Sequence, residues 1–300
     1  MRILLIGGGW SNEREVSLNG VRAIQQALEQ LDHEVELFDP AKDFSRLSER
    51  AAANDFAFIN LHGAPGEDGL IQAILEQAEC PYQGTGPAGS MLALNKAAAK
   101  AIFRRCLVPT PQWEFLPLPP REDWEPSLDC PLFAKPNSGG LSLDVTKIEG
   151  QAELQSFLDR LFARGEEVLL EEMISGREVT CAVLGSEPLP PILIEPAGSS
   201  QFFDYYSKYT PQAAKEICPA PISEELTARI EELAVRCHTS LGLMGYSRTD
   251  FIVRGEEPFA LEVNTLPGMT ATSLLPQSAH AAGYSFKDLI AKLIELGLQR

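Results

Sequence analysis

The stretch Gly245–Leu274 constrains this chain more than any other part of its sequence. Within it, Asp250–Val253 and Phe259–Val263 have the length and residue types of two short strands. The five residues between them, 254–258, are polar and include Gly and Pro, which is typical of a hairpin loop. We therefore expect a β-hairpin at this point of the chain.

Pairing about that loop decides which side chains share a face of the hairpin. Asp250 lies opposite Glu262, and Arg248 lies opposite Asn264, so all four point to the same side. The other side carries apolar residues suited to a core, namely Phe251, Val253, Leu261 and Val263. One wall of the hairpin would then hold two carboxylates, an amide oxygen and a guanidinium.

Carboxylates this close repel each other unless a cation joins them. The ligands are all oxygen, with no His or Cys among them, which favours a hard ion such as Mg²⁺ over Zn²⁺. Mg²⁺ beside an arginine is suited to neutralising phosphate charge during phosphoryl transfer. An ordinary hairpin with a polar outer face is the alternative.

Length and charge narrow the class of protein. Three hundred residues suggest two or three compact units, and a hydrophobic content of 44% is enough for a sizeable core. The net charge of −17 argues against nucleic acid or an anionic membrane as the main partner. It still allows a local basic site for ATP.

The cysteines and the apolar runs indicate the cellular compartment of the chain. The six cysteines are scattered without a CxxC pair, which favours a reducing cytoplasm and gives no zinc pattern. The apolar run Ile3–Ile6 is too short for a signal peptide, and no window approaches the roughly 18 apolar residues of a membrane span. We therefore expect a cytoplasmic location and no membrane partner.

The N-terminal part alternates strands with helices. Strands are expected at Arg2–Ile6, Val35–Phe38 and Phe56–Leu61. Helices are expected after Ser17, a plausible N-cap, and around Leu70–Leu75. This order predicts a Rossmann-like parallel sheet covered by helices, with ligands at the C-terminal strand ends. NAD is not expected, because Asn12 stands where G-x-G-x-x-G needs its third glycine.

Those strand ends, 7–13 and 62–68, carry the first candidate site residues. Glu13, taken alone, is a helix-start acid favoured by the helix dipole. His62, taken alone, is more often a hydrogen-bonding residue at a strand end than a catalyst. Only their shared position at strand ends makes both of them candidates for a site.

Two lysines follow on the next expected helix. The turn cluster Gly84–Pro87 predicts a domain boundary. A helix is then expected over Ala88–Leu107, and it contains Lys96 and Lys100. The alternative for each lysine is an ordinary solvent-exposed face.

A strand with a lysine and a glycine-rich turn comes next. Leu132–Pro136 carries Lys135 near its end and leads into the Gly- and Ser-rich residues 137–142. Glycines allow backbone N–H groups close to a phosphate, and the lysine supplies charge. No Gly-Lys-Ser/Thr follows, so this is not a Walker A motif, and by itself the turn is a weak signal.

The rest of the chain continues with strands, helices and one long loop. Further strands are expected at Val145–Ile148, Val168–Glu172 and Glu178–Leu184. Further helices are expected at Gln151–Ala163, Glu224–Leu241 and Phe286–Leu298. The aromatic and polar stretch Ser199–Tyr209 predicts a loop able to fold over a ligand.

Several long motifs, in order along the chain, resemble a known family. They are GGGWSNEREVSL, LHGAPGEDGLIQAILE, SGREVTCAVLG, and RTDF followed by LEVNTLPGMTATSLLP. From Gly7 to about Phe286 the chain resembles the D-alanine–D-alanine ligases of the ATP-grasp superfamily. The resemblance implies an α/β (α+β) ATP-grasp fold after the Rossmann-like domain, with ATP between two antiparallel sheets. It implies domains at 1–86, 87–170 and 171–300.

The resemblance also implies site residues. The catalytic residues would be Glu13, Arg248, Gly268 and Tyr209. The residues that bind the amino acids would be His62, Ser273 and Leu274. The ATP-binding residues would be Lys96, Lys135, Ser142, Glu171, Met173, Glu178 and Lys208. The ligands of two Mg²⁺ ions, which Mn²⁺ could replace, would be Asp250, Glu262 and Asn264.

The implied activity is the ATP-dependent joining of two D-alanines through an acyl phosphate, for peptidoglycan precursor synthesis. The implied partners are D-alanine and ATP, and a homodimer is expected from the family alone. One alternative is an ATP-grasp ligase that joins other amino acids, or an amino acid and a hydroxy acid. Another is a catalytically silent nucleotide-binding homologue, against which the intact Arg248, Asp250, Glu262 and Asn264 set weighs.

One loop departs from the family pattern. The family usually has two adjacent serines after the loop glycine and a glycine two residues further on. Here Leu141 replaces the first serine and Asp144 replaces the later glycine. In the family that serine bridges the residues that match Glu13 and Tyr209, and leucine cannot make those hydrogen bonds. The resemblance therefore leaves the amino-acid specificity open.

Overall fold

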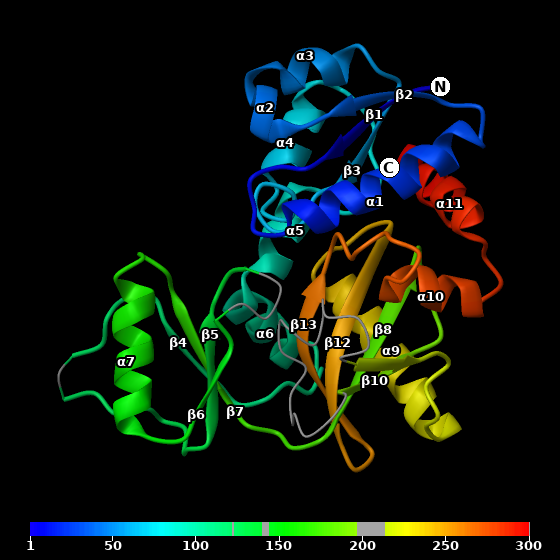
Figure 1. The fold of residues 1–300 in the computed structure, drawn as a ribbon. Coiled ribbons are helices and arrows are strands. Elements are labelled where there is room, and N and C mark those ends of the chain that lie inside the picture. The colour runs from blue at the N-terminus through cyan, green and yellow to red at the C-terminus, as the bar shows by residue number, and fades with distance from the viewer. Residues whose placement is uncertain (122, 140–143, 197–213, 300) are drawn as a thin grey trace.

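The computed structural model describes residues 1–121, 123–139, 144–196 and 214–299 (Figure 1). Within these residues the strands form one parallel sheet and two antiparallel sheets. The parallel sheet lies at the top of Figure 1, the four-stranded sheet at the lower left and the larger sheet at the lower right. The α/β (α+β) class expected from the sequence is confirmed.

The N-terminal sheet is parallel, with the strand order β2-β1-β3. Its strands are β1 (Arg2–Gly7), β2 (Glu34–Phe38) and β3 (Phe56–Asn60). The helices of this part are α1 (Arg14–Glu29), α2 (Pro40–Asp43), the 3₁₀ helix η1 (Phe44–Arg46), α3 (Leu47–Ala52) and α4 (Leu70–Gln77). Strands β1 and β3 are buried along nearly their whole length, as in other parallel sheets covered on both faces.

Ser17 does not cap a helix, and this prediction was wrong. The N-cap of α1 is Glu13, so the helix begins about one turn earlier than expected. The buried Ser17 hydroxyl instead accepts a hydrogen bond from the Gly8 N–H at 2.8 Å and donates one to the Asn60 carbonyl oxygen. Ser17 therefore ties α1 to the C-terminal ends of β1 and β3.

The C-terminal helix belongs to the N-terminal core. Helix α11 (Phe286–Leu298) has the predicted bounds and starts with a capping box between Ser285 and Asp288. Its apolar face packs in the same core as β1 and α1, and Figure 1 shows α11 beside α1. The residues of that face are Leu289, Ile290, Leu293 and Ile294. The last residues of the chain thus complete the unit that the first residues begin.

The four-stranded sheet is antiparallel, with the order β4-β7-β5-β6. Its strands are β4 (Trp113–Leu116), β5 (Leu132–Pro136), β6 (Thr146–Ile148) and β7 (Val168–Glu172). Helix α7 (Gln151–Phe162) packs on it through an apolar stripe in a separate core. Strand β4 was not predicted. The expected boundary between residues 170 and 171 falls inside β7, which pairs with β5 as far as Glu172.

The larger sheet is also antiparallel and has the order β11-β10-β8-β12-β13, with β9 beside β8. Its strands are β8 (Arg177–Leu184), β9 (Glu187–Pro188), β10 (Ile192–Pro196), β11 (Ala214–Ile217), β12 (Tyr246–Arg254) and β13 (Glu257–Asn264). Helix α9 (Glu224–Ser240) covers one face, and α10 (Leu274–Ala281) follows β13. Strands β9, β10 and β11 and helix α10 were not predicted from the sequence.

The single helix expected over 88–107 is two helices, α5 (Pro87–Leu94) and α6 (Lys96–Arg105). Asn95 between them is extended, and its side chain caps α6 by accepting the Ala98 N–H at 3.0 Å. Both helices share a core with the larger sheet and α9. We therefore propose that α5 and α6 form a unit with the larger sheet, while β4–β7 with α7 form another.

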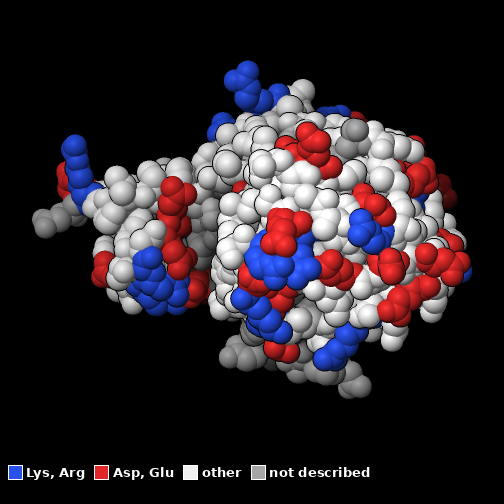
Figure 2. Space-filling view, turned by 90° about the horizontal axis from the view of Figure 1, so that it is seen from above, with Lys and Arg blue, Asp and Glu red and all other residues white. Residues whose placement is uncertain are grey.

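The surface carries charges of both signs. On the face seen in Figure 2, acidic and basic side chains are intermingled, and basic side chains do not form one broad patch. None of the described helices has the length and apolar content that crossing a membrane requires.

Candidate active site

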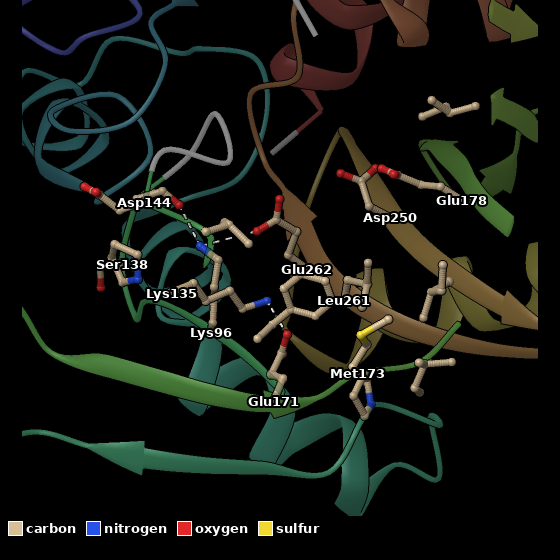
Figure 3. A pocket seen from close by; sticks show the side chains of 18 of the residues that line it. Lys96, Lys135, Ser138, Asp144, Glu171, Met173, Glu178, Asp250, Leu261 and Glu262 are labelled. Atoms are coloured by element: carbon tan, nitrogen blue, oxygen red, sulfur yellow. Dashed lines mark hydrogen bonds and ion pairs between the residues drawn. The ribbon is translucent and has the colours of Figure 1, made fainter. Parts of the chain in front are cut away.

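A cavity of about 1210 Å³ lies between the two antiparallel sheets. Its walls come from β5 and β7 on one side and from β8, β10, β12 and β13 on the other, with N-terminal loop residues at one end (Figure 3). The predicted site residues that line it are Glu13, Lys96, Lys135, Glu171, Met173, Glu178, Asp250 and Glu262. The fold therefore brings together residues that the sequence spreads over most of its length.

The predicted hairpin register is confirmed at the site. Asp250 pairs with Glu262, and Arg248 pairs with Asn264. We name these four residues, Arg248, Asp250, Glu262 and Asn264, the hairpin cluster.

The rest of the predicted hairpin was wrong in two ways. Arg254 pairs with Glu257, so the connection is two residues long rather than five. A register shift, a β-bulge, lies between Asp250 and Phe251 and compensates for the shorter turn. Because of the bulge, Ala260 takes the core position and Leu261 lines the cavity instead (Figure 3).

Asp250 is held by three neighbouring side chains. The Arg248 guanidinium donates to both carboxylate oxygens, at 2.9 and 2.8 Å. Thr180 on the neighbouring strand β8 donates its hydroxyl at 2.6 Å, and Asn264 donates its amide at 3.2 Å. Thr180 was missed by sequence reasoning, because its role depends on β8 pairing with β12. The arrangement fixes the guanidinium in one orientation beside Asp250, which lines the cavity.

Glu262 faces a lysine from a different element. The Lys96 ammonium lies 3.3 Å from a Glu262 oxygen and donates to the Gly139 carbonyl oxygen at 2.6 Å (Figure 3). Lys96 is the first residue of α6, and it is buried rather than on a solvent-exposed face. The α6 terminus, the glycine-rich turn and the hairpin therefore meet at one ammonium group.

A second charged group is buried deeper. The Glu171 carboxylate lies between the Lys100 ammonium, at 2.6 Å, and the Lys135 ammonium, at 2.5 Å. We name Lys100, Lys135 and Glu171 the lysine cluster. Burial alone would raise the pKa of Glu171, but the two ammonium groups hold it below its ordinary value. Burial lowers the pKa of Lys100 to about 8.

Lys100 was not a predicted site residue. Its ammonium also donates to the Thr110 hydroxyl at 2.6 Å, and its side chain is fully buried. A lysine four residues after Lys96 on the same helix would have been the only signal for it, since such spacing puts both on one face.

His62 is buried behind the cavity wall. Its Nδ1 lies 3.0 Å from the Leu266 carbonyl oxygen, so Nδ1 carries the proton. Nε2 has no hydrogen-bond partner among the described residues. Burial lowers the pKa of His62 to about 4, so the ring is neutral at pH 7.

Glu67 completes the contact between the N-terminal loop and the chain after β13. Its carboxylate accepts the Gly63 N–H at 2.8 Å and the Leu266 N–H at 3.3 Å. Burial raises the pKa of this carboxyl. Sequence reasoning missed Glu67, although it lies in the 62–68 strand end that was singled out.

The predicted residues after β13 lie close together but do not line the cavity. Ser273 is the N-cap residue of α10, and Leu274 is the first residue of that helix. The Ser273 hydroxyl accepts the Thr270 N–H at 3.0 Å. A Cβ on Gly268 would come within 2.9 Å of the Ser273 hydroxyl, so the absence of a side chain allows this close approach.

Four residues singled out in the sequence lie outside the described residues. They are Leu141, Ser142, Lys208 and Tyr209. Their assignments stay predictions.

The donor set of the cavity fits Mg²⁺ held jointly with phosphate. Among the described residues, no three His, Cys, Asp or Glu side chains gather closely enough to hold a metal ion by themselves. Asp250 and Glu262 lie opposite each other and already attract the cationic groups of Arg248 and Lys96. One or two carboxylates completed by nucleotide phosphates are the usual protein ligands of Mg²⁺.

Comparisons with known proteins agree with this geometry. The family model described as D-ala D-ala ligase C-terminus matches residues 112–295. A D-alanine–D-alanine ligase from Oleidesulfovibrio alaskensis is 60% identical over 299 residues, which are 99% of this chain and 97% of that protein. This chain belongs to the D-alanine–D-alanine ligase family.

Solved ligases of this family share the whole fold. The D-alanine–D-alanine ligase from Bacillus anthracis has a TM-score of 0.90 at 36% identity, covering 100% of this chain and 98% of that one. Its complex with ATP has a TM-score of 0.86 at 34% identity, with the same coverage. The VanG D-Ala:D-Ser ligase from Enterococcus faecalis has a TM-score of 0.83 at 30% identity, covering 99% of both chains. The ATP-grasp fold expected from the sequence is confirmed.

Proposed function

We propose that this chain joins two D-alanines to D-alanyl-D-alanine at the expense of ATP, for the synthesis of a cell-wall precursor. One observation carries the proposal: two carboxylates of the hairpin cluster, Asp250 and Glu262, line a cavity that two lysines, Lys96 and Lys135, also line. Family membership and the 60% identity to a named D-alanine–D-alanine ligase support the choice of substrate.

The nucleotide is assigned to the cavity between the sheets. Lys96 and Lys135 would face the phosphates, Met173 the adenine, and Glu178 the ribose, since all four line the cavity. The Glu171 carboxylate already binds two ammonium groups, so Glu171 would contact adenine through its backbone atoms.

Mg²⁺ would be held by the oxygens of Asp250, Glu262 and Asn264 together with the ATP phosphates. When bound, it would neutralise phosphate charge, and Mn²⁺ could replace it. Arg248, oriented by its two hydrogen bonds to Asp250, would stabilise negative charge on the reacting carbonyl oxygen, together with the Gly268 N–H.

The chemistry follows from the poor reactivity of a free carboxylate. A carboxylate oxygen of the first D-alanine attacks the γ-phosphorus of ATP, which forms an acyl phosphate and releases ADP. The amino group of the second D-alanine attacks the acyl carbon, and phosphate leaves as the amine loses its proton. Both steps build negative charge beside the hairpin cluster.

Residues of the N-terminal unit and of α10 would bind the amino acids. Glu13 lines the cavity and would hold the ammonium of the first D-alanine. Ser273 and the Leu274 N–H, at the start of α10, would bind the carboxylate of the second. Neutral His62 presents a lone pair at Nε2, so it suits a donor group of the substrate better than a carboxylate.

An assay of ADP release over pairs of amino acids, with mass detection of the product, tests the proposal. We expect the fastest turnover and a D-alanyl-D-alanine product with D-alanine alone. D-serine, D-lactate and L-alanine are the comparison acceptors, because the VanG neighbour is named a D-Ala:D-Ser ligase. Faster turnover with another acceptor would identify that acceptor, rather than D-alanine, as the second substrate. ATP binding without any product would indicate a catalytically silent homologue.

A further inference from the structure

The chain leaves β5 at Asn137 and returns toward β6 at Asp144, and both of these points are anchored. Asn137 is fully buried; its N–H donates to the Glu167 carbonyl oxygen at 2.9 Å, and its side-chain amide donates to the Glu167 carboxylate at 2.7 Å. Its side-chain oxygen accepts the Ala97 N–H at 2.9 Å. The start of this connection is therefore fixed to α6 and to the residue before β7.

Asp144 anchors the other end by charge. Its carboxylate pairs with the Arg164 guanidinium at 2.6 Å and with the Arg160 guanidinium on α7. Arg164 also binds Glu166 at 2.9 Å, and Arg160 stacks over the Phe157 ring at 5.2 Å. Both arginines are therefore held by α7 and the turn after it.

The backbone of Asp144 suits this position. Its φ of 59° lies in the left-handed region, which glycine adopts freely and which Asp and Asn tolerate better than most other residues. A glycine would satisfy the backbone here but would leave both guanidinium groups without this carboxylate. Partial burial alone would raise the pKa of the Asp144 carboxyl, but the two arginines hold it below its ordinary value.

These contacts belong to the cavity wall. Ser138, Gly139, Asp144 and Arg164 all line the cavity, and Figure 3 shows Ser138 and Asp144 on the same side of it. The Gly139 carbonyl oxygen on this wall binds the Lys96 ammonium. A shift of Gly139 would therefore change the position of Lys96, which is assigned to the phosphates.

We propose that Asp144 is a positioning residue for ATP, whose ion pairs with Arg160 and Arg164 fix the part of the cavity wall that Asp144 and Arg164 themselves form. The inference rests on the proposed function, because it takes the ligand of this wall to be ATP. Asp144 acts through the wall rather than by touching the reacting atoms.

Asp144→Asn tests the inference, because asparagine keeps the size and tolerates the backbone conformation but loses the charge. The control is Asp159→Asn, the same change on α7, where the carboxylate accepts from Gln155. Calorimetry with MgATP should show binding weakened about threefold to tenfold, the range for a partly exposed pair of ion pairs. KM for ATP should rise to the same extent, with kcat within about twofold of the unaltered chain.

A double-mutant cycle separates the effect of the ion pairs of Asp144 from a general effect on the fold. In the Arg160→Gln/Arg164→Gln background, Asp144→Asn should add no further loss of ATP affinity, because its partners are already absent. Equal ATP affinity in Asp144→Asn and Asp159→Asn would overturn the inference, as would additive effects in the cycle. Thermal melting of each variant shows whether an affinity loss reflects unfolding instead.

The outcomes also separate this inference from the proposed function. If the unaltered chain binds ATP but makes no D-alanyl-D-alanine, the proposed function fails, and the calorimetric comparison still decides the role of Asp144. If the unaltered chain binds no ATP, both fail.

Discussion

The hairpin cluster and the lysine cluster each contribute two side chains to the same cavity but differ in how they are built. The hairpin cluster comes from two strands joined by a tight turn; its Glu262 side chain keeps 23% of its surface exposed and Arg248 keeps 14%, while Asp250 keeps only 6%. The lysine cluster comes from α6, β5 and β7, and its side chains are at most 8% exposed. Local pairing therefore places the most accessible carboxylate of the two clusters, Glu262, and tertiary packing produces the buried lysine cluster.

The difference in exposure between the two clusters decides which charges can change partners. The Glu262 carboxylate can exchange Lys96 for a ligand, because it is partly exposed and water screens its charge. A buried carboxylate between two ammonium groups cannot lose a partner without leaving an uncompensated charge. We therefore expect the hairpin cluster to govern activity and the lysine cluster to govern stability.

The largest expected effect is on stability, in the lysine cluster. Glu171→Gln leaves two buried ammonium groups without their carboxylate, which should lower the free energy of unfolding by about 3–5 kcal/mol. Urea denaturation measures it, with Glu225→Gln at an exposed site on α9 as the control. A loss equal to that of the control would contradict the assignment of stability to the lysine cluster, since the buried charges would then not support the fold.

The next effect is on activity, in the hairpin cluster. Glu262→Gln removes a negative carboxylate that would hold Mg²⁺ against the phosphates, so turnover should fall by about 10²-fold or more. Its free energy of unfolding should change by less than about 1 kcal/mol, as for other partly exposed pairs. Glu257→Gln, an exposed site on the same strand, is the control. Normal turnover at saturating Mg²⁺ would remove Glu262 from the site.

As pH falls, the fold should lose stability through His62 before it loses stability through the lysine cluster. Burial holds the pKa of His62 at about 4, so the unfolded chain binds more protons between its ordinary value of 6.5 and pH 4, and stability falls as pH falls through this window. From pH 6.5 to 5 the loss should be about 2 kcal/mol, at about 1.4 kcal/mol per pH unit. The pKa of Glu171 is lowered in the folded chain, so its contribution to stability is lost only when the pH falls below its ordinary pKa of 4.5.

His62→Asn provides the check on this pH dependence. Urea midpoints at pH 6.5 and 5 should lie closer together in the variant than in the unaltered chain. An unchanged difference would assign the acid sensitivity to another group, for which buried His238, with a pKa of about 4, is the first candidate.

The smallest effect concerns the strand that supports the hairpin cluster. Thr180→Val keeps the shape but removes the hydroxyl that donates to Asp250, which should cost about 1.5 kcal/mol of stability. Thr239→Val, at an exposed site on α9, is the control for urea denaturation. If Thr180→Val unfolds no more easily than this control, Asp250 does not depend on β8.

Much of the site was predictable because it depends on short-range order. Alternation along two strands was enough to place Arg248, Asp250, Glu262 and Asn264 on one face, since side chains in a strand repeat every two residues. The parallel N-terminal sheet followed from the alternation of strands and helices along the chain. Motif resemblance then supplied the family, which the comparisons confirm.

Tertiary structure alone decided the remaining features. The bulge that turns Leu261 into the cavity lies in β13: β12 keeps an unbroken register with β8 but shifts by one residue against β13, which no local pattern encodes. The partners of Lys100 and Asp144 come from distant elements, and α11 completes a core that begins at β1. Sequence determines which residues can share a face of one element; packing between elements decides which charges lose water and which partners they meet.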